Sequence, residues 1–206
     1  MYINSKMLEP TEIIGGAIAV YKDAWTNVQE TIDEIEMVTG DPTSNVRFVP
    51  AQTRGDQETN NPGYQTIRTN YLLGLTDSGK INENLRKINN RFYELLFSAS
   101  SFYCKSFDIQ EPIFDAEGYS LLKYSGGQHY KAHYDGGTDS GRSLSAILYI
   151  NGDYSGGEIE FVNFDIKIKP EPGMLILFPS NYAYRHIAHP VETGTKYAIV
   201  TWLHDR

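Results

Sequence analysis

Apolar and polar positions recur with two different periods along this chain of 206 residues. Between 81 and 105, apolar side chains return every three or four positions, which is typical of one face of an α-helix. A shorter stripe with the same spacing comprises Val28, Ile32 and Ile35. Just before it, Thr26 and the glutamine three residues later match a capping box, which predicts a helix that begins near Thr26.

After residue 108 the pattern changes to short apolar runs that are separated by glycine-rich turns, as in β-strands. Eight strands are predicted, at 118–124, 128–134, 142–151, 158–163, 165–169, 174–179, 184–190 and 196–203. A further short strand is predicted at 17–21. Strands at this spacing indicate a sandwich or barrel-like double sheet against which helices pack. The sequence therefore predicts a β-rich α+β fold.

Residues 39–63 are rich in Gly, Pro, Asn, Thr and Asp, a composition that breaks both helices and strands. This predicts a long loop. In a compact domain such a loop is either a lid or binding loop, or simply mobile surface, and the composition favours neither.

Charge and cysteine content narrow the class of protein. The net charge of −8 argues against a nucleic-acid binder, which needs clustered Lys and Arg to neutralise phosphates. Cys104 is the single cysteine, so no intrachain disulfide can form and a reducing compartment is expected. The first ten residues lack a secretory signal pattern, and no run of eighteen apolar residues occurs. These features predict a soluble, cytoplasmic protein that has no membrane segment.

His133 and Asp135 are two positions apart at the end of a predicted strand. Because strand side chains alternate between faces, both project the same way while Tyr134 points elsewhere. Two imidazoles and one carboxylate can occupy one face of an octahedral Fe(II) and leave three positions open. The second imidazole would come from a distant strand, as His186 or His189, which cannot both face one metal because they are three positions apart.

Lys196 follows His186 by ten residues, on a strand-like run. An anion inside an apolar barrel needs a cation and hydrogen-bond donors, since an unpaired buried carboxylate costs several kcal/mol. Beside an iron site, this lysine predicts a seat for a dicarboxylate cosubstrate. The alternative is an ordinary surface lysine that follows a turn.

An ordered set of motifs covers 119–204. They are Tyr-Ser-Gly-Gly-Gln-His-Tyr-Lys-Ala-His-Tyr-Asp at 124–135, Arg-Ser-Leu-Ser-Ala-Ile-Leu-Tyr-Ile-Asn at 142–151, Gly-Gly-Glu-Ile-Glu-Phe at 156–161, Pro-Gly at 172–173, and the segment 186–202. Together they resemble the prolyl 4-hydroxylase group of the Fe(II)/2-oxoglutarate dioxygenases. The resemblance implies a double-stranded β-helix, a jelly-roll or cupin-like core that is buttressed by N-terminal helices. We expect 1–206 to be a single domain, in which 1–108 supplies helical support and the candidate lid, and 109–206 forms the catalytic part.

The resemblance also implies the ligands and cofactors. Iron ligation falls to His133, Asp135 and His186, because the distal histidine of the family lies four residues before a proline, here Pro190. His189 is then a residue of the surface or of the surroundings of the site. The cofactors implied are Fe(II), 2-oxoglutarate as cosubstrate, O2, and ascorbate as a reductant.

Four residues are implied at the cosubstrate. Lys196 would contact the distal carboxylate of 2-oxoglutarate, where many relatives have an arginine; a lysine makes a point contact in place of a fork. Tyr130 and Tyr149 would donate hydroxyls to the same carboxylate or pack around it, and Tyr124 would serve the keto-acid end. Taken singly, each tyrosine is equally compatible with a place in the core.

Arg142, Trp202 and His204 match positions that line the substrate entrance in prolyl hydroxylases. They imply a hydroxylase of a proline-containing peptide or protein, and the alternative is a hydroxylase of a free amino acid or another small molecule. Arginine and histidine at such places are also common surface residues. Two other classes remain open: a zinc hydrolase, and a cupin-like metal- or sugar-binding protein without oxygenase chemistry.

Overall fold

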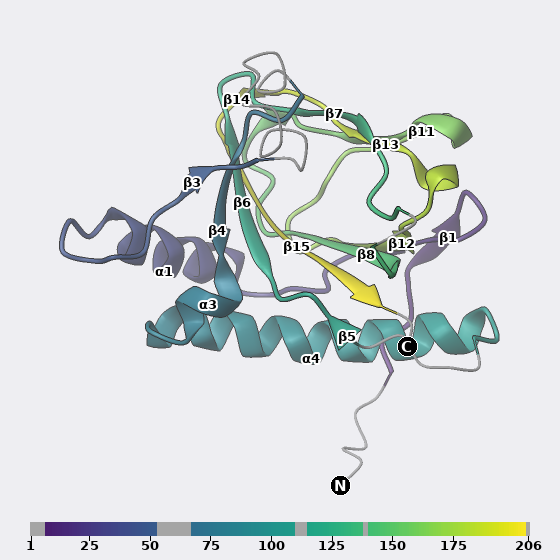
Figure 1. Cartoon of the computed structure of the whole chain (residues 1–206), viewed down its shortest axis with the longest axis horizontal. Helices are drawn as coiled ribbons and strands as arrows, with labels where there is room; N and C mark the ends of the chain where they lie inside the picture. The colour runs from purple at the N-terminus through teal and green to yellow at the C-terminus, as the bar shows by residue number, and fades with distance from the viewer. Residues whose placement is uncertain (1–6, 53–66, 110–114, 138–139, 205–206) are drawn as a thin grey trace, which may run out of the picture.

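Two β-sheets face each other, and helices cover the outer face of the larger sheet (Figure 1). The computed structural model describes residues 7–52, 67–109, 115–137 and 140–204. Within these ranges the eight strands predicted after residue 108 are all present, with ends that differ by a few residues from the prediction. The double sheet predicted from the spacing of turns is therefore confirmed.

The large sheet mixes strands from both halves of the chain. Its order is β1 (Glu12–Ile14), β2 (Ile18–Tyr21), β12 (Leu175–Pro179), β8 (Arg142–Tyr149), β15 (Thr195–His204), β6 (Ser120–Ser125), β4 (Tyr71–Gly74) and β3 (Val49–Pro50), with β5 (Asp115–Ala116) paired to β15. The N-terminal part was expected to give mainly helical support. It also extends both edges of this sheet, because β1 and β2 add to β12 while β3 and β4 add to β6.

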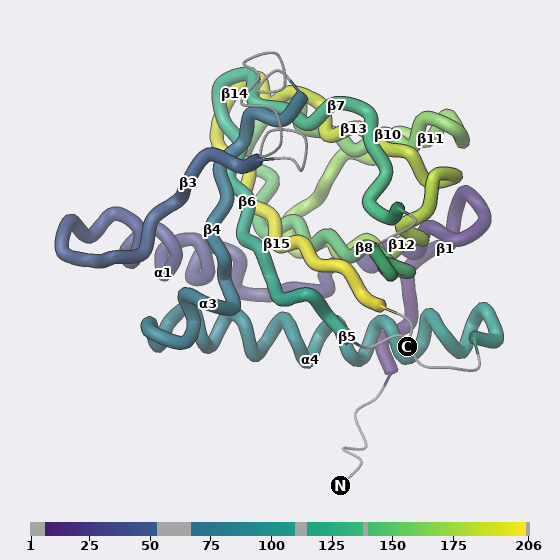
Figure 2. The backbone as a smooth tube through the Cα atoms, viewed as in Figure 1, coloured from purple at the N-terminus to yellow at the C-terminus, as the bar shows by residue number. Residues whose placement is uncertain are grey.

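The small sheet lies across the space from the large one. Its order is β11 (Ile166–Ile168), β10 (Ile159–Phe161), β13 (His186–Ala188) and β7 (Tyr130–His133), and these strands run side by side in Figure 2. Next to it, β14 (Val191–Thr193) pairs with β9 (Ser155–Gly156). Two 3-10 turns flank the sheet, η2 (Val162–Phe164) and η3 (Tyr182–Tyr184).

Strand alternation divides the core into two layers. One set of buried side chains faces the helices, among them Ala19, Leu148, Leu177 and Ile199. The neighbours of these residues along the strands, Val20, Tyr149, Ile176, Phe178 and Ala198, point the other way and form an apolar layer with Ile159 and Phe161 of the small sheet. The space between the sheets is therefore apolar, except where polar side chains enter it.

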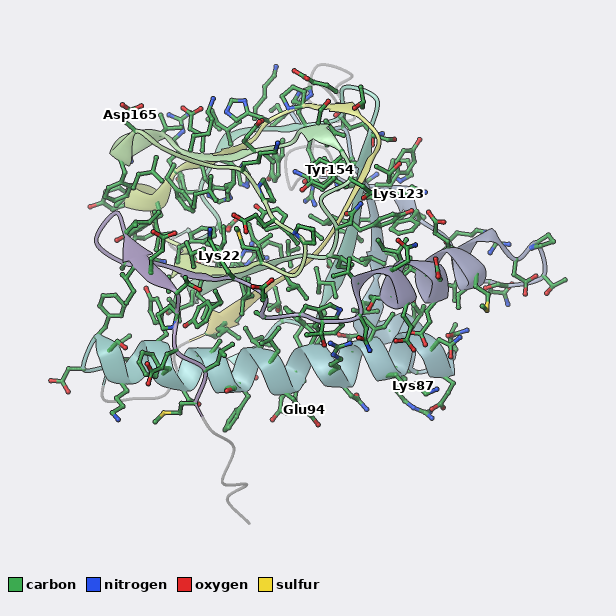
Figure 3. The ribbon with its side chains drawn as sticks, turned by 180° about the vertical axis from the view of Figure 1, so that it is seen from behind. Lys22, Lys87, Glu94, Lys123, Tyr154 and Asp165 are labelled. Carbon is green, nitrogen blue, oxygen red and sulfur yellow. The ribbon has the colours of Figure 1, made fainter. Side chains whose placement is uncertain are left out.

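The helices are α1 (Val28–Gly40), α3 (Leu75–Gly79) and α4 (Glu83–Ser106). The predicted apolar stripe of α4 is buried at Leu85, Ile88, Phe92, Leu96 and Ala99. Ile81 is an exception at 71% exposure, because the helix begins two residues after it. Lys87 and Glu94 project from α4 away from the sheets (Figure 3). The charged side of this helix is thus a solvated face.

The capping box predicted at Thr26 is wrong. The N-cap of α1 is Asn27, in the left-handed region at φ 57°, and no side chain caps the helix. Arg91 of α4 donates instead to the carbonyl and hydroxyl oxygens of Thr26, and its guanidinium lies 4.0 Å from the ring centre of Trp25. Thr26 thus links the start of α1 to α4 and does not cap α1.

The candidate lid at 39–63 is only partly described. Its first residues end α1, and Val49–Pro50 form β3 on the edge of the large sheet. Residues 53–63 lie outside the described part of the chain, so the lid stays a hypothesis. No helix in the described ranges has both the length and the apolar composition needed to cross a membrane.

Phe92→Ala is expected to lower the free energy of unfolding by about 3–5 kcal/mol, the usual cost of emptying an aromatic core position. Phe92 is 0% exposed and its ring meets Tyr119 edge-on, with 4.8 Å between ring centroids. Urea denaturation measures the loss. Tyr93→Ala is the matched control: Tyr93, the next residue of α4, is 55% exposed, and the expected loss is less than about 1 kcal/mol. Equal losses would contradict the orientation of α4.

Candidate metal and cosubstrate site

The antiparallel register of two short strands brings the two candidate imidazoles together. His133 at the end of β7 pairs directly with His186 at the start of β13. Asp135 follows His133 by two residues, so it projects to the same side. On its other side, His186 pairs with Phe161 of β10, and its ring meets that of Phe178 edge-on at 5.0 Å. Strand pairing in the small sheet therefore fixes the positions of both histidines, and the ring of His186 packs in the apolar layer between the sheets.

Three side chains form a compact N, N, O cluster. The Oδ1 atom of Asp135 lies 3.5 Å from Nε2 of His133, and its Oδ2 atom lies 3.8 Å from Nε2 of His186. One donor atom from each of the three lies within 4.8 Å of the others. Two imidazoles and a carboxylate are a donor set that suits an octahedral ferrous ion with open positions. Among the described residues, this is the one group of three or more His, Cys, Asp or Glu with such geometry.

The orientation of both rings suits metal binding. The Nδ1 atom of His133 lies 2.8 Å from the carbonyl oxygen of Lys131, and that of His186 lies 3.1 Å from the carbonyl oxygen of Tyr184. A carbonyl oxygen can only accept, so Nδ1 carries a proton in each ring and Nε2 is the atom available to a metal. Both Nε2 atoms face Asp135. Burial lowers the pKa of His186 to about 4, which keeps this ring neutral.

Asp135 is held at two points. Its Oδ2 atom accepts a hydrogen bond of 2.6 Å from Ser145, whose hydroxyl lies 2.9 Å from that of Ser180. Its carbonyl oxygen accepts from Nη1 of Arg142 at 3.1 Å. Burial alone would raise the pKa of Asp135, but the imidazoles and the Ser145 hydroxyl hold that pKa well below its usual range. The carboxylate is therefore ionised and fixed in place.

His189 lies apart from the cluster. Its Nε2 atom is 2.7 Å from Oε2 of Glu160, which also pairs with Lys167 at 3.3 Å. The ring is therefore engaged in a partly exposed ion-pair group on β10 and β11. The choice of His186 over His189, which the resemblance implied, agrees with this placement.

A cavity between the two sheets joins the cluster to the predicted cosubstrate residues. The residues that line it come from both sheets: Arg68, Leu122, Tyr124, Tyr130, His133, Asp135, Ser145, Ala146, Ile147, Tyr149, Ile159, His186, Ala188, Lys196, Ala198, Val200, Thr201 and Trp202. Along β15 the alternate positions 196, 198, 200 and 202 all line it, as strand alternation requires. One face of a single strand thus runs from Lys196 to Trp202 along the cavity.

Lys196 is 2% exposed, which excludes the alternative of an ordinary surface lysine. Its Nζ atom donates to the carbonyl oxygen of Gly157 at 2.9 Å, and it lies 4.5 Å from the ring centre of Tyr124 and 5.8 Å from that of Tyr149. Within the described ranges no carboxylate forms an ion pair with it. Burial lowers the pKa of Lys196 to about 8, so at neutral pH the cavity holds an ammonium that no carboxylate of the described residues contacts.

The three predicted tyrosines line the same cavity. Tyr130 stacks on the ring of His133, with centroids 3.5 Å apart and planes at 16°. Burial raises the pKa of Tyr124 to about 12, and it raises that of Tyr149 well above its usual value. Both hydroxyls therefore keep their protons at neutral pH and can donate hydrogen bonds.

The predicted entrance residues form a cluster of their own. Arg142 donates from Nε and Nη2 to the two carboxylate oxygens of Glu117, each at 2.6 Å, and its guanidinium lies 3.7 Å from the ring centre of Trp202. The Nε2 atom of His204 lies 2.9 Å from Glu117. Of the three, only Trp202 is part of the cavity lining. Arg142 and His204 contact the carboxylate of Glu117 instead.

Four residues of this region escaped the sequence analysis. Ser145 could have been found by alternation, since it shares a strand face with Tyr149. Glu117 and Arg68 lie between regular elements, where no periodic signal exists. Tyr154 is buried, and its hydroxyl has no hydrogen-bond partner among the described residues, yet its ring lies against Gly157, whose carbonyl accepts from Lys196. Tyr154 is buried in a cluster with Leu122 and Val191, which only the folded chain brings near.

Comparisons with known proteins agree with this geometry. Residues 119–204 match the model of the 2OG-Fe(II) oxygenase superfamily. A PKHD-type hydroxylase of Prochlorococcus marinus (strain MIT 9301) is 39% identical over 110 residues, which cover 50% of this chain and 47% of that protein. The chain thus spans about half the length of curated relatives that it matches.

Solved structures show the fold. A prolyl hydroxylase from Trichoplax adhaerens, in complex with a hypoxia inducible factor peptide fragment, superimposes with a TM-score of 0.70 over 93% of this chain and 84% of that one, at 18% identity. A prolyl-4-hydroxylase from Pseudomonas putida superimposes with a TM-score of 0.64 over 92% and 93%, at 17% identity. The facing sheets are thus the double-stranded β-helix expected from the sequence.

The family match and the relatives lead to the same group as the motifs, the His-Asp-His cluster and the fold. Residues 119–204 belong to the 2OG-Fe(II) oxygenase superfamily, and the chain shares its fold with prolyl hydroxylases.

Proposed function

We propose that this protein is a hydroxylase that depends on Fe(II) and 2-oxoglutarate. The observation that carries the proposal is the coexistence, in one cavity, of the His133, Asp135 and His186 cluster with the buried, unpaired ammonium of Lys196. A metal hydrolase has no use for that ammonium, and a sugar-binding protein has no use for the cluster. A diacid that chelates a metal at one end needs both.

The residues divide the binding of the diacid between them. His133, Asp135 and His186 would hold the metal, and Lys196 would receive the distal carboxylate, with donors from Tyr124 and Tyr149 nearby. The apolar walls, such as Ile147, exclude water, so that the ammonium and carboxylate attract each other strongly. Bound Fe(II) supplies the chemistry in which O2 converts 2-oxoglutarate to succinate and carbon dioxide and hydroxylates a C–H bond. In our proposal, ascorbate keeps the metal reduced.

The proposed substrate is a proline-containing peptide or protein. Relatives in both comparisons are named prolyl hydroxylases, and Trp202 offers an apolar ring beside the cluster where a pyrrolidine can pack. Arg142 and Glu117 hold that ring from behind. The whole chain is proposed to act as one domain, since strands from its first half complete the large sheet.

Asp135→Ala is expected to abolish both succinate formation and the weak visible absorption that forms when Fe(II) and 2-oxoglutarate are added without oxygen. The change removes the one charged ligand of the cluster. Asp33→Ala, on the exposed side of α1, is the matched control and should retain both signals. Normal turnover by Asp135→Ala with normal iron content would contradict the assignment.

Ser145→Ala is expected to weaken metal binding by about 10- to 100-fold, the usual effect of losing a hydrogen bond to a ligand. The hydroxyl of Ser145 holds Oδ2 of Asp135 at 2.6 Å. Isothermal titration with Mn(II) measures the loss without any turnover. Ser143→Ala, on the same strand, is the control, because the Ser143 hydroxyl makes no hydrogen bond to a described residue. Equal affinities for both variants would show that Ser145 does not position Asp135.

The affinity for 2-oxoglutarate is expected to fall as the pH rises above about 8. Burial lowers the pKa of Lys196 to about 8, so above that pH the free protein must take up a proton to bind the diacid. The dissociation constant should then rise by up to about tenfold per pH unit. Titration of the Mn(II) form at several pH values measures this. Lys196→Arg keeps its charge throughout and should give a flat profile; a flat profile for the unmodified protein would argue against Lys196 as the anchor.

A further inference from the structure

Arg68 brings a second cation into the cavity, one that no motif indicated. The residue precedes β4 and lines the cavity together with Tyr124, Tyr130 and the metal cluster. The other charged side chains in that lining are Lys196 and Asp135, and its remaining titratable groups are two histidines and three tyrosines. Arg68 therefore enters directly into the charge balance of the site.

The backbone fixes Arg68 at the edge of the small sheet. Arg68 forms an antiparallel bridge with Tyr130 of β7. On either side of this bridge, the backbone amide of Lys131 donates to the carbonyl oxygen of Ile67 at 2.8 Å. The backbone amide of Thr69 donates to the carbonyl oxygen of His129 at 3.1 Å. The chain before β4 thus runs up beside β7 (Figure 2). Since bridged residues project to the same face, Arg68 and Tyr130 point the same way.

Two side chains orient the guanidinium. Its Nε atom donates to Oδ1 of Asn70 at 2.8 Å, and Asn70 is itself 1% exposed and tied to the backbone at Tyr71. The guanidinium carbon lies 4.8 Å from the ring centre of Tyr130, which also stacks on the ring of His133. Asn70 and Tyr130 together hold the arginine one aromatic ring away from a candidate metal ligand.

The outer edge of the guanidinium has no anion. In the described part of the chain, Arg68 forms no ion pair, and its Nη1 and Nη2 atoms make no hydrogen bond to a described residue. Arg142, the other arginine near the site, differs in this respect because Glu117 binds it through both carboxylate oxygens. A fork of N–H donors with this freedom matches a carboxylate.

The charge balance indicates which molecule supplies that carboxylate. With the proposed function, Arg68, Lys196 and a doubly charged metal ion face Asp135 and a doubly charged diacid, which leaves one positive charge without a counterpart. The two carboxylates of 2-oxoglutarate are already assigned, one to Lys196 and one to the metal. The remaining charge favours a singly negative group on the molecule that is hydroxylated.

We infer that Arg68 and Asn70 form a subsite for a carboxylate of the substrate, close to the carbon that reacts. The inference rests on the proposed function and names the class of its substrate. The carboxylate is either that of a free amino acid or that of an acidic residue beside the proline in a peptide. Both sources present the same chemistry to the guanidinium.

Two matched pairs of probes test the subsite and separate the sources. One pair is L-proline and L-prolinamide. The other is a short peptide, acetylated and amidated at its ends, that contains Pro-Glu or Pro-Gln. Binding to the oxygen-free Fe(II) and 2-oxoglutarate form is measured by calorimetry and by the change in its visible absorption. In one pair at least, the acid should bind about tenfold or more tightly than its amide, since hydrogen bonds to charged groups contribute this much.

Variants assign the preference to Arg68. Arg68→Gln should remove the preference for the acid and leave the affinity for 2-oxoglutarate unchanged, while Arg68→Lys should restore part of the preference. Arg86→Gln removes one positive charge from the exposed face of α4 and should behave like the unmodified protein. Thermal unfolding of each variant verifies that it is folded. If Arg68→Gln does not fold, the preference for the acid measured with Arg68→Lys tests the subsite in its place.

Two results would overturn the subsite. The first is the absence of any preference for the acid in both pairs, including the absence of binding by all four probes. The second is a loss of 2-oxoglutarate affinity in Arg68→Gln, which would make Arg68 a residue of the cosubstrate. Failure of the proposed function looks different, because the unmodified protein would then form no visible complex with Fe(II) and 2-oxoglutarate.

Discussion

The register between β7 and β13 is the constraint on which the rest of the site depends. Pairing of His133 with His186 sets two imidazoles opposite each other, and Asp135 joins them because it is two positions further along. A slip of one residue would turn either histidine to the other face. The Nδ1 contacts with backbone carbonyls then orient rings that the register has already brought together. The geometry of the candidate metal site therefore follows from the pairing of β7 with β13.

The site also imposes a cost on the fold. Lys196 is buried with its charge unpaired, and Arg68 lacks an anion among the described residues, so the cavity presents two cations that a ligand would neutralise. Such groups are unfavourable in the free protein. The outer layer offsets this cost, because α1 and α4 bury the other face of the same sheet with side chains such as Ile35 and Phe92. Two opposite faces of one sheet thus serve stability and ligand binding.

The spacing of apolar residues and the motifs of the sequence predicted much of this arrangement. Alternation placed His133 with Asp135, and the period of 81–105 gave the face of α4, because both depend on local geometry alone. The cap predicted at Thr26 is wrong, since Arg91 of a distant helix donates to that residue and the helix begins after Asn27. Arg68 and Glu117 escaped for a related reason: each acts through a partner that only the folded chain brings near.

One measurement tests the central claim most directly. Crystals grown without oxygen in the presence of Fe(II) and 2-oxoglutarate would show the iron by anomalous scattering at its absorption edge. The account predicts a single strong peak within bonding distance of Nε2 of His133, Nε2 of His186 and the Asp135 carboxylate, with density for the diacid that reaches Nζ of Lys196. A peak at any other place, or a diacid that points away from Lys196, would contradict it.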